Sequence, residues 1–155
     1  MDTYDPKKAA QVWQRVRQAT PVETDGGELL GLIAGEWTDT ATYLRLSRQF
    51  QGREAQLLRR LYEEEQAHAA CLKGIYTLMT GQRPPVHTPT VPQESPEITL
   101  RRCYGREMRS LAQYERHSDH PEYGPVFARL AEQEREHCRI ILELLGRMKP
   151  KKAAQ

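Results

Sequence analysis

Residues 65–68 read EQAH and residues 134–137 read EREH, so the pattern E-x-x-H occurs twice in this chain. A glutamate and a histidine three positions apart lie on the same face of a helix, where both side chains can reach one ion. One such motif is a weak signal, because helices are rich in glutamate. Two motifs, each on the second helix of a predicted helix pair, are a much stronger one.

The repetition extends beyond these motifs. Glu36 and Tyr43 are seven residues apart, and so are Glu107 and Tyr114. Seven residues make two helical turns, so each glutamate shares a helix face with its tyrosine. Apolar positions also correspond: Leu61 with Leu130, Leu72 with Ile141, and Ile75 with Leu144. The chain therefore reads as two copies of a helix pair, each supplying two glutamates and one histidine.

Helical spacing of apolar residues predicts four long helices, with Gly52 and Gly81 as breaks. A turn at residues 118–121 carries a predicted N-cap just before its proline, and Gly146 with Pro150 ends the last helix. The first expected helix opens at Gly26-Gly27 and its apolar residues run to Phe50, and the second lies between Gly52 and Gly81. The third covers about residues 96–116, and the fourth follows the turn at residues 118–121.

Residues 82–96 hold five of the ten prolines, so this segment is predicted to be extended. About fourteen extended residues span on the order of 45 Å, whereas a helix of about 24 residues is ~36 Å long. The segment can therefore run the whole length of a bundle. Two helix pairs joined by one long crossover predict an all-α, ferritin-like four-helix bundle over residues 26–147.

Shorter segments flank the predicted bundle. Apolar residues at helical spacing predict a short amphipathic helix at residues 6–19, within an N-terminal arm that covers residues 1–25. This arm is expected to pack on the bundle or on a second subunit. Residues 148–155 are predicted to form a flexible basic tail.

Four carboxylates in the core of a bundle would be very costly if they were left unpaired. Two divalent cations bring four positive charges, and two neutral imidazoles complete the ligand set. Di-iron and di-manganese bundles use this pattern: one glutamate from each of two helices and E-x-x-H from the other two. Oxygen and imidazole ligands suit iron, or alternatively manganese, and no thiolate is required. The predicted metal ligands are Glu36, Glu65, His68, Glu107, Glu134 and His137.

These residues, with Tyr43, Tyr114 and the long crossover, make residues 27–147 resemble the rubrerythrin branch of the ferritin-like superfamily. The resemblance implies that the six predicted ligands bind two iron ions, with Glu65 and Glu134 bridging them. It also implies that Tyr43 and Tyr114 belong to the catalytic site, where they hydrogen-bond to the carboxylates and orient them.

The chain also departs from the rubrerythrin pattern. Rubrerythrins carry a further glutamate where this chain has Ser110, and the symmetric place is Asp39, which could partly substitute for it. Metal movement on redox change, a rubrerythrin property, therefore does not follow from the resemblance. Rubrerythrins proper also carry a rubredoxin domain, and this sequence contains no C-x-x-C motif. Electrons are therefore expected to come from a separate donor protein.

The resulting hypothesis is a cytoplasmic di-iron oxidoreductase, expected to be a homodimer, that reduces peroxide or reacts with dioxygen. The alternatives are a di-manganese catalase-like enzyme, a protein that oxidises ferrous iron for storage, and a metal-free helical interaction module. Storage requires a cage, so the mass in solution distinguishes it from a dimer.

The composition does not favour binding to nucleic acid or to a membrane. The net charge of +2 creates no strong field towards either partner. No apolar run approaches the ~20 residues that span a bilayer, and the first residues do not resemble a signal peptide.

The remaining polar residues receive simpler interpretations. The histidines outside the motifs are predicted to lie at the surface: His87, His117 and His120. The glutamates beside the motifs are predicted to face solvent: Glu63, Glu64, Glu132 and Glu136. The cysteines are predicted to be reduced, buried thiols: Cys71, Cys103 and Cys138.

Overall fold

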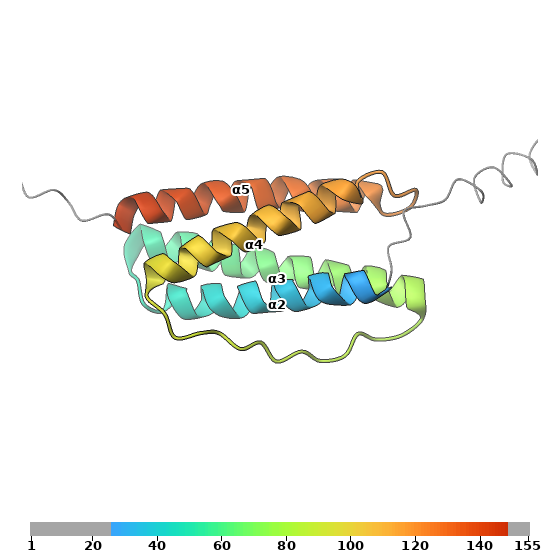
Figure 1. The fold of residues 1–155 in the computed structure, drawn as a ribbon, viewed down its shortest axis with the longest axis horizontal. Coiled ribbons are helices and arrows are strands. Elements are labelled where there is room, and N and C mark those ends of the chain that lie inside the picture. The colour runs from blue at the N-terminus through green and yellow to red at the C-terminus, as the bar shows by residue number, and fades with distance from the viewer. Residues whose placement is uncertain (1–25, 149–155) are drawn as a thin grey trace, which may run out of the picture.

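The computed structural model describes residues 26–148, and this part of the chain consists of four α-helices without a β-strand (Figure 1). The helices are α2 (Gly26–Ser47), α3 (Gly52–Thr80), α4 (Pro96–Arg116) and α5 (Gly124–Met148). The prediction of an all-helical protein is therefore confirmed for the described residues. Helix α5 ends at Met148, between Gly146 and Pro150 as predicted, whereas α2 ends at Ser47, earlier than predicted. The predicted arm over residues 1–25 and the tail after Met148 lie outside the described residues.

Glycine and proline determine where α3 and α4 begin and end. Gly52 and Gly81 have φ angles of +62° and +70°, in the left-handed region that favours glycine. The N–H of Gly81 donates to the carbonyl of Thr77 at 2.9 Å and closes α3. Ser95 accepts a backbone N–H from the first turn of α4, and Pro96 occupies the first position of that helix. These ends agree with the predicted ones.

The start of α5 differs from the prediction, because the helix begins at Gly124 instead of Pro121. Nδ1 of His120 accepts the second and third backbone N–H groups that follow it, at 3.1 and 3.0 Å. Residues 121–123 meanwhile form a turn. Gly124 passes so near the carbonyl of Ser118 that a Cβ there would lie 2.5 Å from its oxygen. The chain thus folds back tightly before the helix can start.

Helices α2 and α3 form one close pair, and α4 and α5 form the other (Figure 1). Backbones approach each other much less between the pairs, so long side chains fill the space between them. Residues 81–95 connect the pairs and run along the outside of α2, from the end of α3 to the opposite end of the molecule (Figure 1). Arg45 of α2 holds this segment by donating to the carbonyl oxygen of Pro92 at 2.7 Å.

Two apolar clusters fill the interior, one towards each end of the four helices. One contains Leu29 and Phe127, and the other contains Leu58 and Ile140. The apolar residues that correspond in the two halves of the sequence are all at most 4% exposed, as the repeat predicts. Between the clusters lies a layer of buried polar side chains. The fold thus encloses a layer of polar side chains between two apolar clusters.

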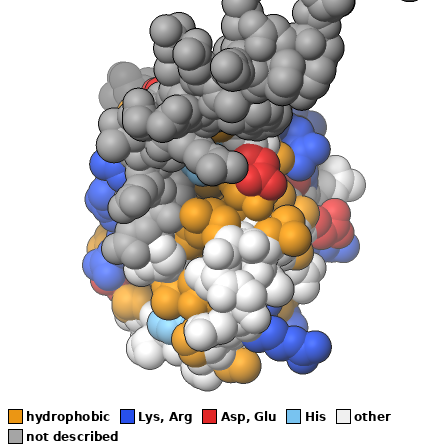
Figure 2. Space-filling view, turned by 90° about the vertical axis from the view of Figure 1, so that its right-hand side faces the viewer, with side chains coloured by type: hydrophobic (Ala, Val, Ile, Leu, Met, Phe, Trp, Pro, Cys, Tyr) orange, Lys and Arg blue, Asp and Glu red, His pale blue; other side chains and the backbone are white. Residues whose placement is uncertain are grey.

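The outer surface adds two observations. No helix in residues 26–148 is long and apolar enough to cross a membrane. Hydrophobic side chains gather at the end of the molecule where α2 begins and α3 ends (Figure 2). A pocket of 630 Å³ with lining residues that include Trp37, Lys73, Leu78 and Val86 lies between α2, α3 and the start of the connecting segment. None of the six predicted metal ligands lines it, so this pocket is separate from the buried polar layer.

Candidate metal centre

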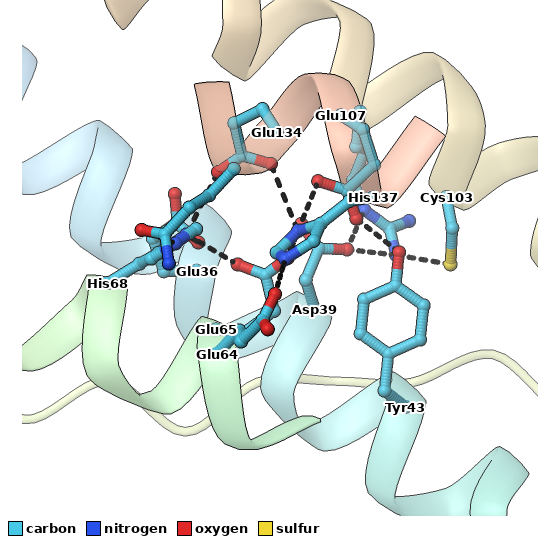
Figure 3. A network of polar contacts seen from close by, with 12 residues as sticks. Glu36, Asp39, Tyr43, Glu64, Glu65, His68, Cys103, Glu107, Glu134 and His137 are labelled. Atoms are coloured by element: carbon cyan, nitrogen blue, oxygen red, sulfur yellow. Dashed lines mark hydrogen bonds and ion pairs between the residues drawn. The ribbon is translucent and has the colours of Figure 1, made fainter. Parts of the chain in front are cut away.

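The six predicted ligands lie together in the polar layer, and all four described helices contribute to them (Figure 3). Each is at most 2% exposed. Helices α2 and α4 supply one glutamate each, whereas α3 and α5 each supply a glutamate and a histidine. In chain order they are Glu36, Glu65, His68, Glu107, Glu134 and His137. The E-x-x-H residues of α3 and α5 offer ligand atoms within 4.8 Å of one another, so they could hold a metal ion.

The two imidazoles lie in the middle of this group, with ring centroids 5.2 Å apart and planes 17° from parallel. Nδ1 of His68 is 3.0 Å from a carboxylate oxygen of Glu134 and 3.3 Å from one of Glu65. A third carboxylate oxygen, from Glu36, lies 3.7 Å from the same nitrogen. One imidazole nitrogen therefore faces three carboxylates from three helices.

His137 repeats this arrangement with the two halves of the chain exchanged. Its Nδ1 is 2.7 Å from Glu65 and 3.4 Å from Glu134. Its third carboxylate neighbour is Glu107, at 3.6 Å. Each imidazole thus faces both glutamates of the E-x-x-H motifs and one glutamate from the first helix of its own half.

Most of these inward-facing atoms make no hydrogen bond. Seven buried side-chain atoms in residues 26–148 lack a hydrogen-bond partner of acceptable geometry, and six of them belong to this group. They are both oxygens of Glu65 and Glu134 and Nδ1 of His68 and His137. These atoms lie as little as 2.7 Å apart, but their contacts do not have the geometry of hydrogen bonds. Buried polar atoms are normally satisfied, so this donor set fits metal ions bound among it.

Two buried tyrosines hold the remaining glutamates. The hydroxyl of Tyr43 donates to Oε1 of Glu107, and that of Tyr114 donates to Oε1 of Glu36. These are hydrogen bonds of the kind that the rubrerythrin resemblance implies, and each one links the two halves of the chain. Burial raises the pKa of both tyrosines well above the usual value, and the adjacent carboxylates raise it further. The hydroxyls therefore keep their protons at neutral pH and act as donors.

Two further residues contact the outer nitrogens of the histidines, and sequence reasoning missed both. Oε2 of Glu64 lies 2.7 Å from Nε2 of His137, and Oε1 of Gln133 lies 3.1 Å from Nε2 of His68. The prediction that Glu64 faces solvent is wrong, because its side chain is only 25% exposed and reaches inward (Figure 3). Positions 64 and 133 are separated by the same 69 residues as the two histidines. The internal repeat therefore contained a signal for this pair.

Burial and charge divide the four carboxyl groups into two kinds. Burial raises the pKa of Glu65 well above the usual range, and the charge of Glu107 raises it further. Burial also raises the pKa of Glu107 to about 7. For Glu36 burial alone would raise the pKa, but the contacts with Glu65 and His68 lower it below the usual value. Glu134 also has a lowered pKa, because its contacts with Glu107 and the two histidines outweigh the effect of burial.

Both imidazoles are charged in the metal-free protein. Burial would lower the pKa of His68, but the nearby carboxylates of Glu134 and Glu36 raise it to about 12. The pKa of His137 is raised for the same reason, because the nearby carboxylates of Glu107 and Glu134 oppose the effect of burial. Two imidazolium groups therefore balance two carboxylates, and protons occupy the places that the donor set offers to metal ions.

Asp39 and Ser110 occupy the two positions where the rubrerythrin pattern suggests a further acidic ligand. The carboxylate of Asp39 is buried and lies 2.6 Å from the guanidinium of Arg106. Ser110 lines a small pocket of 200 Å³ with both residues, between α2 and α4. Asp39 therefore pairs with a cation of the protein itself, and its service as a metal ligand stays a prediction.

The histidines outside the motifs do not reach the centre. His87 is exposed and His120 is half-buried. The prediction that His117 lies at the surface is wrong, because its side chain is fully buried. Its Nε2 lies 3.0 Å from a carboxylate oxygen of Glu28, and its ring packs on Phe127 at 5.3 Å. The chain turns directly after α4, and this turn carries the imidazole inward beneath α5.

The cysteines are free thiols. Cys103 and Cys138 are buried, as predicted, whereas Cys71 is only half-buried. Burial raises the pKa of Cys103 to about 12 and that of Cys138 to about 11. Both groups therefore remain protonated at neutral pH, and the donors that the centre offers are oxygen and imidazole nitrogen.

No protein-family model, curated protein or solved structure matches this chain. The evidence for a function therefore comes from the donor set and its geometry.

Proposed function

We propose that this chain is a di-iron carboxylate oxidoreductase of rubrerythrin type, on a ferritin-like four-helix bundle with a long crossover. The enzyme reduces peroxide or reacts with dioxygen and takes electrons from a separate donor protein. The observation that carries the proposal is the set of six buried carboxylate and imidazole atoms that make no hydrogen bond and face one another.

The symmetry of the contacts favours two metal ions over one. Each imidazole Nδ1 faces Glu65 and Glu134, and each has one further glutamate from its own half of the chain. Two ions that each take one imidazole would share Glu65 and Glu134 as bridges. Glu36 and Glu107 would then bind one ion each, held in place by their tyrosine hydrogen bonds.

Carboxylate oxygen and imidazole nitrogen suit iron or manganese. When bound, a pair of ferrous ions supplies two electrons, which together with two protons convert hydrogen peroxide into two molecules of water. The separate donor protein then returns the two electrons. Four anionic carboxylates would balance the four positive charges of the ferrous pair.

The chain itself contributes protons and a dry environment. Tyr43 and Tyr114 hold protons against the carboxylates of Glu107 and Glu36, so the hydroxyls or a bound water can deliver them. The apolar clusters on both sides of the polar layer keep water away. Exclusion of water strengthens the interaction between the carboxylates and developing charge.

The test is the reaction of ferrous-loaded protein with peroxide. Protein loaded with two equivalents of Fe²⁺ in the absence of air should oxidise two ferrous ions to ferric ions for each hydrogen peroxide added. Near-ultraviolet absorbance follows this oxidation, and no dioxygen should be released. Glu65→Gln with Glu134→Gln should abolish the reaction. The matched control is Glu63→Gln with Glu132→Gln, because these exposed glutamates lie on the same two helices. Bound iron that reacts with neither peroxide nor dioxygen would contradict the proposal.

Other outcomes point to the alternative functions. Release of dioxygen from peroxide by manganese-loaded protein would indicate a catalase-like enzyme. A cage of many subunits in solution would indicate iron storage. Protein that binds no metal and keeps its stability in chelator would indicate a helical interaction module.

A further inference from the structure

The two halves of the centre match in the contacts among the six ligands and the two tyrosines, but they differ in the residue that contacts the outer nitrogen of each imidazole. Nε2 of His137 contacts the carboxylate of Glu64, whereas Nε2 of His68 contacts the side-chain amide of Gln133. The two contacts occupy corresponding places, each from the residue directly before the glutamate of the opposite motif. A charged group thus supports one imidazole, and a neutral group supports the other.

This difference changes the properties of the inner nitrogens. A carboxylate can only accept, so Glu64 requires a proton on Nε2 of His137 and leaves Nδ1 free to bind a cation once its own proton is lost. The negative charge also makes that Nδ1 a stronger electron donor. Gln133 presents a carbonyl oxygen at 3.1 Å, but an amide can also turn its NH₂ group inward. It therefore fixes the imidazole of His68 less strictly and adds no charge.

Neighbouring charges weaken this difference without removing it. Nε of Arg60 lies 2.9 Å from the other oxygen of Glu64, but the arginine side chain is 48% exposed and screened by solvent. The contact between Glu64 and His137 is shorter, at 2.7 Å, and the histidine is completely buried. The arginine also holds the glutamate in place, because it is four residues away on the same helix.

We infer that the two metal positions are unequal, and that the position at His137 binds a divalent cation more tightly than the position at His68 because of Glu64 and Gln133. Both act as positioning residues, because each acts through the histidine that it contacts. This inference rests on the proposed two-metal centre. Partners of this kind typically change metal affinity by roughly ten- to a hundredfold.

Titration of the metal-free chain with Mn²⁺ in a calorimeter tests the inference. Wild-type protein should bind two ions in two steps. Repulsion between the cations separates two steps even at equal positions, so the informative quantity is the ratio of the two dissociation constants. Glu64→Gln should weaken the tighter step and reduce the ratio roughly tenfold or more. Gln133→Glu should strengthen the weaker step and also reduce the ratio.

The exchange of both residues provides the most specific control. Glu64→Gln combined with Gln133→Glu restores one carboxylate and one amide, so the ratio should return to the wild-type value. Glu63→Gln, an exposed neighbour on α3, should leave the ratio unchanged. Circular dichroism checks that each variant is folded.

The outcomes separate this inference from the proposed function. If the ratio of the two dissociation constants were the same in the wild type, in Glu64→Gln and in Gln133→Glu, the inference would be overturned. The proposed metal centre would stand, because each chain would still bind two ions. A wild-type chain that binds no Mn²⁺ and no Fe²⁺ would overturn both.

Discussion

At the scale of single residues, the proposed centre depends on side chains that contact the predicted ligands but are not ligands themselves. Tyr43 and Tyr114 each give one hydrogen bond to a glutamate from the other half of the chain. These bonds occupy one oxygen of each carboxylate and turn the second oxygen towards an imidazole. The tyrosines therefore fix the orientation in which each carboxylate would bind a metal ion.

Tyr43→Phe and Tyr114→Phe remove these hydrogen bonds while the rings still fill their places. We expect each variant to bind Mn²⁺ about tenfold more weakly, because a carboxylate that is no longer oriented is a poorer ligand. Calorimetric titration measures the change. Tyr62→Phe, at a half-buried position on α3, is the matched control. Wild-type affinity in both tyrosine variants would mean that the two rings only fill space.

Metal binding should also depend steeply on pH. The raised pKa of His68, about 12, keeps its imidazole charged in the metal-free protein. Its contribution to stability is complete below about pH 6.5 and decreases progressively as pH rises from there towards 12. A metal ligand must be neutral, so binding displaces the imidazole protons and those on Glu65 and Glu107. We expect roughly three to four protons released per pair of ions at pH 7, and weaker binding as pH falls.

Calorimetry of this reaction in buffers with different enthalpies of ionisation counts the released protons directly. The exposed-glutamate variant Glu63→Gln should release the same number as the wild type. Binding that is independent of pH between 5 and 8 would contradict the proton exchange described here.

The sequence predicted individual residues well where two constraints agreed. Glu65 and His68 share a helix face with buried leucines and recur in the second half, so spacing and repetition both pointed to them. Glu64 was misplaced because it lies one position away from the inward face. Its side chain is long enough to reach the imidazole of His137 on the neighbouring helix. Such a contact depends on the packing of two helices, which the sequence of one helix does not contain.

At the scale of the helices, glycines in left-handed backbone allow α3 to begin and end where it does. Gly81 has a φ of +70° and closes α3, whereas Gly74 lies exposed within the same helix with open space around it. The two glycines therefore have opposite effects on stability.

Gly81→Ala should destabilise the protein by about 1 kcal/mol, because a Cβ is strained in the left-handed region. Gly74→Ala should stabilise it by roughly 0.5–1 kcal/mol, because alanine loses less conformational freedom in a helix. Unfolding by urea measures both, and a change of the same sign in the two variants would contradict this account of α3.

Helix ends were predictable where glycine or proline acts locally, as at Gly52, Gly81 and Pro96. The start of α5 was not, because it depends on the backbone of Gly124 lying against Ser118. The same turn buries His117, which the sequence placed at the surface. Both errors come from one tight turn whose geometry is set by contacts between residues that are not adjacent.

At the scale of the whole molecule, the repeat of the sequence becomes an approximate two-fold symmetry of the site. Each half supplies its own glutamates and histidine, and each half supports the other through a tyrosine and a residue before the motif. The four-helix arrangement followed from apolar spacing and the proline-rich segment. The exchange of supporting contacts between halves did not, because it appears only when the two pairs pack together.

Metal content per chain is the most direct test of the central claim that this polar layer binds two cations. Wild-type protein, dialysed after incubation with Fe²⁺ without air and analysed by atomic emission, should contain two metal ions per chain. Glu65→Ala combined with Glu134→Ala should contain almost none, while Glu63→Ala combined with Glu132→Ala should still contain two. A wild-type chain that retains no metal, or a Glu65→Ala/Glu134→Ala chain that retains two ions, would contradict it.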